Sequence, residues 1–268
     1  MNNLVSVICT VKNGENTLEE TIKSVMKQTY KNFEFIIIDD GSTDETLNLL
    51  NTLKDKYSKL KIITTDGIGR SEALNLAINN SFGKYIANID ADDLWHPQKL
   101  EIQVEVLKKN PEYFLFSTKS ILFYDNESPT WSNVDKFEYF LTDIDRKLLI
   151  TDTISHPSVI MQKKKLKELG LYDIDRNAQI DYELWLRAFS KNYKMGKIEL
   201  ELVGKRIHKH QSYENKKRIK YIWSSANLQI DYLIRLKKYH LIIFPIVKFL
   251  LGILPFKIRR KINNVIFK

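Results

Sequence analysis

Two largely apolar runs, Val5–Val11 and Phe33–Ile38, constrain the fold more than any other feature of this 268-residue sequence. Both are short and rich in β-branched residues, so we predict strands that are buried on both faces. Shorter strand patterns follow at 61–64 and 85–89, with a helical pattern near 71–80 between them. Strands that alternate with helices predict an α/β fold, in which helices flank a mostly parallel sheet.

The helices between the first strands have recognisable start signals. Thr17 and Glu20 have the spacing of a capping box before an amphipathic pattern. Ser42 and Glu45 have the same spacing before the second helical pattern. We therefore expect Thr17 and Ser42 to cap these two helices.

Acidic side chains follow two of the predicted strands. Asp39-Asp40 ends the second strand, and Asp90, Asp92 and Asp93 follow the strand at 85–89. The carboxyl ends of parallel strands meet at one edge of the sheet, where open α/β sheets bind ligands. Oxygen ligands of this kind suit Mg²⁺ or Mn²⁺. The structural alternative is that Asp92 or Asp93 caps the next helix.

Two common nucleotide-binding motifs are absent from the sequence. The chain contains no GxxxxGK[ST] sequence, which excludes a P-loop. Gly67-Ile68-Gly69 resembles the start of a dinucleotide fingerprint, but Glu72 stands at the third glycine position, where it would repel a pyrophosphate. A nucleotide at the acidic edge would need a metal ion to neutralise its phosphates.

The second half of the chain contains weaker patterns and two further candidate residues. Strands are expected at 113–124, at 159–161 and, as two short strands, at 195–203; helices are expected at 163–169 and from 181; residues 125–150 form a variable excursion. Asp181 stands at a helix start, where a capping role and a catalytic role both remain open. His208 follows the last strand, and a lone histidine there is more often structural than a metal ligand.

The composition limits the compartment and the partners. The single cysteine, Cys9, lies in a strand-like run, which favours a buried thiol in a reducing compartment. The first residues lack the basic and apolar regions of a signal peptide. Residues 205–268 carry 16 Lys and Arg against two acids, whereas residues 1–204 carry 26 against 31. A basic tail on a slightly acidic body is expected to face an anionic surface.

The tail combines its charge with an apolar segment. A helix is expected at 215–240, and the apolar segment 241–256 is shorter than the roughly 20 residues of a membrane-spanning helix. Basic clusters flank it, at Lys237-Lys238 and at 257–261. This pattern predicts that residues 237–268 lie on an anionic membrane surface. The alternative is a helix docked on the domain or in a dimer interface.

Taken together, these motifs resemble the bacterial family 2 glycosyltransferases of GT-A fold, over about residues 4–210. The matching segments, in order, are Val5–Thr10, Asn13-Gly14, Gln28-Thr29-Tyr30, Asp39–Ser42, Asp90–Asp93 with Pro97 and Leu100, and Asp181–Arg187. The resemblance implies a catalytic domain at 1–212, with a nucleotide-binding half at 1–95 and an acceptor-side half at 96–212. A helical, basic and amphipathic extension would occupy 213–268.

The resemblance also implies which residues bind the donor nucleotide. Thr10, Lys12 and Asp40 would line the base pocket, with Asp40 accepting a hydrogen bond from the uracil N–H of a uridine nucleotide. Lys12 replaces the aromatic residue that is usual in the family. Asp92 would bind the ribose or the metal ion.

The remaining roles concern the metal ion and the acceptor. Asp93 would hold an Mn²⁺ or Mg²⁺ ion that bridges the diphosphate, supported by Asp90, and His208 would approach the metal or the diphosphate. Asp181 matches the general base of the family. His156 and Trp185 would lie on the acceptor side.

The resemblance implies an inverting, metal-dependent glycosyltransferase. It would move a sugar from a nucleotide-diphosphate sugar, with a UDP-sugar favoured, to a glycan or lipid-linked glycan in surface polysaccharide biosynthesis. We expect a cytoplasmic protein that is peripheral on the inner face of the cell membrane.

Two other function classes remain as alternatives. A sugar nucleotidyltransferase would normally have a glycine-rich basic loop after the first strand, where this chain has Lys12-Asn13-Gly14-Glu15-Asn16. A non-catalytic nucleic-acid-binding protein would need base-stacking aromatic residues among its basic residues, which the end of the tail lacks. We therefore expect no nucleic-acid partner.

Overall fold

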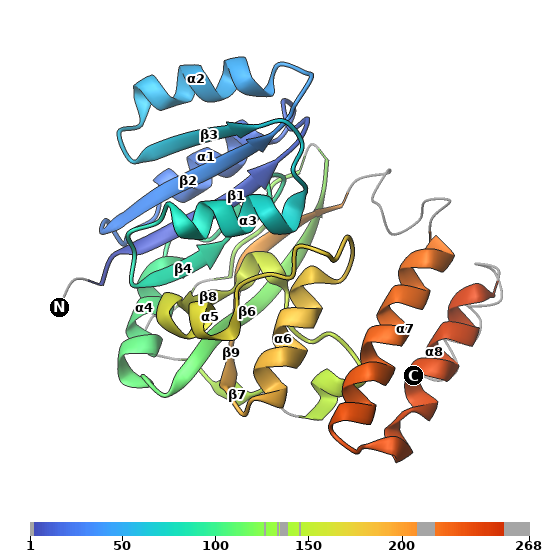
Figure 1. Ribbon diagram of the computed structural model, residues 1–268. Coiled ribbons are helices and arrows are strands. Elements are labelled where there is room, and N and C mark those ends of the chain that lie inside the picture. Colours follow the sequence, from blue (N-terminus) through green and yellow to red (C-terminus); the bar gives the residue numbers. More distant parts are fainter. Residues whose placement is uncertain are drawn as a thin grey trace. The chain divides into compact units, whose positions relative to one another are not determined.

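A computed structural model describes residues 3–125, 127–132, 134, 139–144, 146–207 and 218–254 (Figure 1). The chain divides into two compact units. The first comprises residues 1–145 and 153–208, and the second comprises residues 146–152 and 209–268. The expected domain boundary at 212 and 213 lies outside the described residues.

The first unit contains the predicted sheet and its helices. Its elements are β1 (Val5–Val11), α1 (Leu18–Met26), β2 (Phe33–Asp40), α2 (Thr46–Lys56), β3 (Leu60–Thr65), α3 (Arg70–Asn79), β4 (Tyr85–Asn88), β5 (Leu94–Trp95), α4 (Lys99–Lys109), β6 (Tyr113–Tyr124), β7 (Leu141–Asp143), the 3-10 turn η2 (His156–Ser158), β8 (Ile160–Gln162), α5 (Lys163–Leu169), α6 (Ile180–Ser190) and β9 (Lys194–Ile207).

The strands form one sheet in the order β3-β2-β1-β4-β8-β6-β9-β5, with β7 paired to β9. The first four of these strands are parallel, since β1 pairs in parallel with β2 and β4, and β2 with β3. β8 then pairs antiparallel with β4 and β6, and β6 and β9 are parallel. The prediction of a mostly parallel α/β sheet flanked by helices, with helices added at the C-terminal end, is confirmed.

The alternation of side chains along β1 divides the core into two faces. Val5, Val7, Cys9 and Val11 belong to one buried cluster, together with apolar residues of α1, α2 and α4. Helix α3 contacts β1 and β2 and lies over the sheet in Figure 1. Because both faces are covered, the carboxyl edge of the parallel strands is where polar groups can gather.

Thr17 occupies the predicted N-cap position of α1 without a capping hydrogen bond from its side chain, and the predicted cap Ser42 is wrong. α1 begins at Leu18, but the Thr17 hydroxyl donates to the backbone oxygen of Ala91 instead of capping the helix. α2 begins only at Thr46, where Asp44 Oδ1 accepts from the backbone N–H at 3.1 Å. The Ser42 hydroxyl instead accepts from the backbone N–H of Asn13. In each case the side chain forms its hydrogen bond with a neighbouring loop instead of with the first turn of the helix.

Three other local expectations also differ from the structure. Residues 194–207 form one long strand rather than two short ones, and the two-residue strand β5 was not expected. α4 begins at Lys99 after Gln98, so neither Asp92 nor Asp93 caps it. α6 begins after Gln179, which makes Asp181 its second residue rather than its cap.

The second unit consists of helices. They are the 3-10 turns η1 (Arg146–Leu149) and η4 (Tyr239–Leu241) and the helices α7 (Arg218–Arg235) and α8 (Ile243–Ile253). α8 packs on α7, with the Trp223 and Phe249 rings 5.0 Å apart between centroids. Among the helices of the described part of the chain, none is long and apolar enough to span a bilayer.

Candidate functional site

The carboxyl ends of the parallel strands β2 and β4 bring the two predicted acidic segments, Asp39-Asp40 and Asp90–Asp93, to the same edge of the sheet. Asp40, the last residue of β2, is buried and binds the loop that leads into α3. Its Oδ1 accepts from Thr65 Oγ1 and from the backbone N–H of Ile68, each at 2.7 Å, and its Oδ2 accepts from the N–H of Gly69 at 2.9 Å. Asp40 therefore fixes this loop.

The two other residues predicted for the base pocket lie close to Asp40. Thr10 is partly buried on β1, where it pairs with Ile38 two residues before Asp40. The Lys12 side chain is exposed, and its Nζ lies beside Gly67, 3.5 Å from where a Cβ would stand on that glycine. Gly67 has a φ of +85°, a conformation that glycine adopts without strain. The three predicted residues thus border one loop.

Asp93 is buried, with only 2% of its surface exposed. Its Oδ1 accepts from the backbone N–H of Arg206 on β9 at 3.0 Å, whereas its Oδ2 is buried and has no hydrogen-bond partner among the described residues. Burial and the nearby charges of Asp90 and Asp92 raise the pKa of Asp93 well above its ordinary value. An unpartnered carboxylate oxygen among like charges is costly unless a cation compensates it.

Arg206 holds the acidic segment in place, and sequence analysis did not identify it. Its Nε donates to the backbone oxygen of Asp92 at 3.0 Å, and its guanidinium forms an ion pair with Glu20 on α1. The guanidinium also lies 4.7 Å from the centre of the Phe123 ring. Arg206 therefore ties β9 and α1 to the segment that carries Asp92 and Asp93.

Asp90 forms an ion pair with Arg70, the first residue of α3. Its Oδ1 also lies 3.8 Å from His156 Nδ1. Burial alone would raise the pKa of Asp90, but the charge of Arg70 holds it well below its ordinary value. Asp90 is therefore a charged carboxylate, and the Arg70 side chain is 51% exposed at the surface of the site.

His156 is buried behind this ion pair. Its Nδ1 lies 2.8 Å from Asn88 Nδ2 and 3.3 Å from Arg70 Nη2, and its Nε2 lies 2.9 Å from the Tyr172 hydroxyl. Because a guanidinium can only donate, these contacts favour the tautomer in which Nε2 carries the proton. Trp185 is fully buried, with its ring centre 6.3 Å from that of His156. Neither side chain is open to an acceptor directly, and their acceptor-side role stays a prediction.

Asp181 lies in the first turn of α6, partly exposed, with Oδ1 accepting from the backbone N–H of Tyr182. Its charge acts on two residues of the network just described. Together with the larger effect of Asp90, it raises the pKa of Arg70, and after burial it is the main cause of the raised pKa of Tyr172. The structure thus brings Asp181 into the electrostatic field of the Arg70–Asp90 pair.

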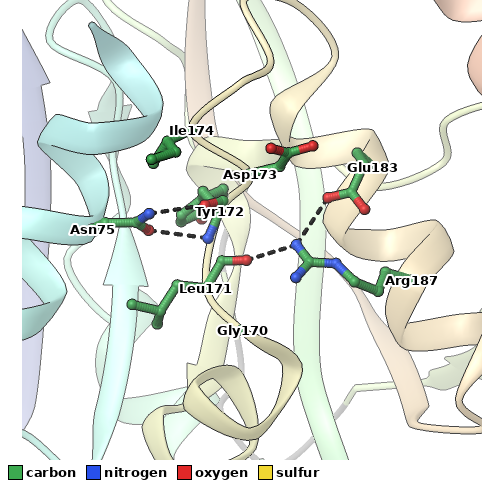
Figure 2. A pocket seen from close by; sticks show the side chains of 8 residues that line it. All are labelled: Asn75, Gly170, Leu171, Tyr172, Asp173, Ile174, Glu183 and Arg187. Carbon is green, nitrogen blue, oxygen red and sulfur yellow. Dashed lines mark hydrogen bonds and ion pairs between the residues drawn. The ribbon is translucent and has the colours of Figure 1, made fainter. Parts of the chain in front are cut away.

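A hollow of about 530 Å³ lies beside this network (Figure 2). It is bordered by α3, by the loop between α5 and α6, and by α6 itself; its lining residues are Asn75, Gly170, Leu171, Tyr172, Asp173, Ile174, Glu183 and Arg187. Figure 2 shows Asn75 bonded to the backbone of Tyr172, and Glu183 paired with Arg187 at 2.8 Å. Most of the polar side chains that line this hollow therefore form hydrogen bonds with the loop between α5 and α6 or with each other.

The metal site stays a prediction. Among the described residues, no group of three or more His, Cys, Asp or Glu side chains is arranged to hold a metal ion. His208, the fourth predicted ligand, lies outside the described residues. Asp93 Oδ2, which no described residue contacts by a hydrogen bond, fits a cation ligand, since hard divalent ions prefer carboxylate oxygen.

Comparison with solved structures identifies the fold. The chain is similar to Staphylococcus aureus TarS 1–349, crystallised in complex with UDP-GlcNAc, with a TM-score of 0.66, 17% sequence identity and coverage of 84% of this chain and 66% of that one. The fold is therefore the GT-A fold expected from the sequence motifs.

Comparison of sequences identifies the family. Residues 6–170 match the family described as Glycosyl transferase family 2, and the chain belongs to this family. It is 31% identical over 214 residues to the UDP-Glc:alpha-D-GlcNAc-diphosphoundecaprenol beta-1,3-glucosyltransferase WfaP of Escherichia coli, covering 80% of this chain and 81% of that protein. It is 33% identical to an uncharacterised glycosyltransferase of Rickettsia prowazekii over 78% of this chain. The chain spans 65% of that relative and 33% of two further Rickettsia relatives.

The residues that sequence analysis missed share one property. Arg70, Asn88, Tyr172 and Arg206 form their contacts across 16 to 114 positions of the chain. No local spacing marks such partners. The one usable signal was Arg70, a basic residue directly after the Gly67-Ile68-Gly69 turn at the carboxyl edge of the sheet.

Proposed function

We propose that this chain is an inverting glycosyltransferase that moves a sugar from a nucleotide-diphosphate sugar to a hydroxyl of a glycan or lipid-linked glycan. The observation that carries the proposal is Asp93 in a family 2 chain: it is buried beside Asp90 and Asp92, and within the described part of the chain its Oδ2 has no partner. This arrangement suits a donor whose diphosphate arrives with a divalent cation. The same proposal includes a role in surface polysaccharide biosynthesis.

The names of similar proteins support a UDP-sugar donor and a lipid-linked acceptor. WfaP is named for transfer from UDP-Glc to a GlcNAc-diphosphoundecaprenol, and the TarS structure holds UDP-GlcNAc. In this chain, Asp40 supports a uridine nucleotide. A carboxylate has about four lone-pair sites, and the loop uses three of those on Asp40, which leaves one for the N–H of a base. Thr10 and Lys12 would border the same base.

The acidic residues divide between the metal ion and the ribose. Asp93 would hold Mn²⁺ or Mg²⁺ through its free oxygen, Asp92 would bind the ribose or the metal, and Asp90 would support them through Arg70. His208 would complete the site, since Arg206, two residues earlier, is hydrogen-bonded to Asp93. The cation would stabilise the charge that develops on the leaving diphosphate.

Asp181 is the proposed general base. Displacement at an anomeric carbon passes through an oxocarbenium-like state and needs little covalent help, so a carboxylate that takes the acceptor proton is the main requirement. Asp181 is partly exposed and stands on a different element from the acids at the end of β4. Inversion requires such a separation, because the acceptor attacks the face opposite the leaving group.

Donor binding and hydrolysis test this proposal. UDP-glucose, UDP-N-acetylglucosamine, GDP-mannose and dTDP-glucose are screened with and without Mn²⁺ by calorimetry and by release of nucleoside diphosphate. We expect Asp93→Ala to lose metal-dependent binding, and Asp181→Asn to bind the donor but turn over at least 100-fold more slowly. Asp55→Ala, an exposed aspartate on α2, is the matched control. If no donor binds to the wild type, the enzyme proposal is wrong.

The second unit carries a surface that supports membrane attachment. Along α8, the side chains Ile243, Phe244, Ile246, Val247, Leu250 and Ile253 are each 41% to 56% exposed. Most of them recur at spacings of three and four, which gathers them on one side of the helix. Lys237 and Lys238 precede the helix in the strongly basic segment 205–268. We propose that this apolar stripe lies in the interface of an anionic membrane, which would bring the site to a lipid-linked acceptor.

Vesicle sedimentation tests the attachment. We expect the wild type to bind vesicles that contain phosphatidylglycerol, to bind phosphatidylcholine vesicles weakly, and to be released by salt. Leu250→Glu should reduce this binding at least tenfold, whereas Leu122→Glu, at a leucine on β6 that is 63% exposed against 56% for Leu250, should not. Equal binding by the two variants would contradict the proposal. A concentration-dependent dimer that Leu250→Glu dissociates would favour a protein interface instead.

A further inference from the structure

The loop between α5 and α6 is tied to α3 at several points. Asn75 on α3 accepts from the backbone N–H of Tyr172 at 3.0 Å and donates to its backbone oxygen at 2.8 Å (Figure 2). Ser71, also on α3, donates to the backbone oxygen of Arg176 at 3.2 Å. The helix that begins with Arg70 therefore also holds the loop that leads to Asp181.

The loop is fixed at both ends as well. At its start, the Arg187 guanidinium donates to the backbone oxygens of Leu169 and Leu171, each at 2.6 Å, and Leu171 has a φ of +62°. At its end, Gln179 has a φ of +58° directly before α6. Non-glycine residues adopt this left-handed conformation only when their surroundings demand it. The start of α6, and with it Asp181, thus depends on the conformation of this loop.

The Tyr172 side chain connects this loop back to Arg70 through His156. The Tyr172 hydroxyl lies 2.9 Å from His156 Nε2, and the two rings meet edge to face with centroids 5.7 Å apart. On the other side of the imidazole, Nδ1 faces Asn88 and Arg70. One buried ring therefore touches both the loop between α5 and α6 and the Arg70–Asp90 pair.

The turn that carries His156 is itself firmly anchored. Trp95 Nε1 donates to the backbone oxygen of Pro157 at 3.0 Å, and Gln103 Nε2 donates to that of Ser158 at 2.8 Å. The Ser158 hydroxyl closes the turn by donating to the backbone oxygen of Ser155. Because the turn cannot shift easily, the imidazole is a fixed reference point for its two neighbours.

We propose that Tyr172 and His156 are positioning residues, which hold the loop before Asp181 in a fixed position relative to the Arg70–Asp90 pair. The inference rests on the proposed function, because it connects the proposed general base, Asp181, with the residues proposed to bind the donor. Neither residue needs to touch a substrate. Loss of the connection should misplace Asp181 relative to the bound donor, and small misplacements of reacting groups lower turnover strongly.

Tyr172→Phe tests the proposal, since it keeps the ring and removes only the hydroxyl. With the donor that the wild type hydrolyses and with Mn²⁺, we expect kcat for hydrolysis to fall about tenfold while the donor Kd stays within twofold. Tyr193→Phe, whose hydroxyl bonds to Glu168 at the surface, is the matched control and should keep its kcat. His156→Gln, which can still accept and donate, should retain more activity than His156→Ala.

A second readout does not depend on activity. Long-range ¹H–¹⁵N spectra of the histidine rings report which ring nitrogen carries the proton. We expect the Nε2-protonated form of His156, identified by its loss in His156→Gln, and a weaker preference for this tautomer in Tyr172→Phe. If Tyr172→Phe leaves both kcat and this signal unchanged, the proposal is wrong.

The outcomes separate this inference from the proposed function. A wild type that binds no nucleotide sugar refutes the function, and the histidine spectra then decide alone whether Tyr172 fixes His156. A Tyr172→Phe variant that loses donor binding as strongly as turnover also overturns the inference, because the loop would then serve binding alone. If Tyr172→Phe fails to fold, the kcat values of His156→Gln and His156→Ala are compared instead. A higher kcat in His156→Gln supports the inference, and equal values overturn it.

Discussion

The backbone N–H of Arg206 donates to Asp93 Oδ1 at 3.0 Å, although 113 positions of the chain separate the two residues. The acidic segment after β4 is therefore held by a strand from the far end of the unit as well as by its own turn, in which the Asp93 N–H donates to the backbone oxygen of Asp90 at 3.2 Å. The Arg206 side chain strengthens this connection through the backbone oxygen of Asp92 and through Glu20. Correct pairing of β9 is thus a condition for a formed site.

Replacing Arg206 with methionine should destabilise the first unit by about 2 kcal/mol. The guanidinium is 6% exposed, and its loss leaves the backbone oxygen of Asp92 without this donor. Urea unfolding measures the effect. Lys23→Met, which removes the exposed ion pair with Glu19 on α1, should cost less than about 0.5 kcal/mol. Equal losses would mean that Arg206 acts only as a surface charge.

Asp40→Ala should cost about 3 kcal/mol of unfolding free energy, because the two N–H groups of Ile68 and Gly69 and the Thr65 hydroxyl lose a charged acceptor. Asp40→Asn keeps one oxygen for these donors and should cost about half as much. Both variants are also expected to weaken UDP binding. A variant that keeps wild-type stability but loses UDP would assign Asp40 to the nucleotide alone.

The sheet could be predicted because its signals are local. The runs at Val5–Val11 and Phe33–Asp40 are buried along almost their whole length, so their composition alone indicated parallel strands. The acids at the strand ends followed from the same reasoning. The resemblance of several ordered motifs then indicated the family, which the match over residues 6–170 confirms.

The caps and the network could not be predicted, because they depend on partners that lie far apart in the sequence. Thr17 has the local environment of a cap, yet its hydroxyl donates to Ala91, 74 positions away. No motif marks Tyr172, and only the fold brings its hydroxyl to His156, 16 positions away. Short polar side chains have several alternative partners of similar energy, and tertiary packing selects among them.

Cys9 should resist thiol reagents in the folded protein. It is the only cysteine, it is fully buried on β1, and burial raises the pKa of its thiol far above its ordinary value. Reaction with Ellman's reagent at pH 8 should therefore be at least 100-fold slower than in urea, and its rate should follow the opening of the sheet. Rapid labelling of the native protein would contradict the burial of β1.

Lys99 should make stability depend on pH. Its side chain is fully buried, with Nζ 3.8 Å from the centre of the Trp95 ring and donating to Gln103 Oε1 at 2.8 Å, and burial lowers its pKa well below the ordinary value. Between this lowered pKa and about 10.4, the unfolded chain binds more protons than the folded one. The free energy of unfolding therefore decreases as the pH falls through that window, by at most about 1.4 kcal/mol per pH unit. Lys99→Met should remove this dependence, whereas Lys54→Met, an exposed lysine on α2, should retain it. Urea unfolding between pH 7 and pH 10 measures the slope, and equal slopes in the wild type and Lys99→Met would show that the amine is solvated.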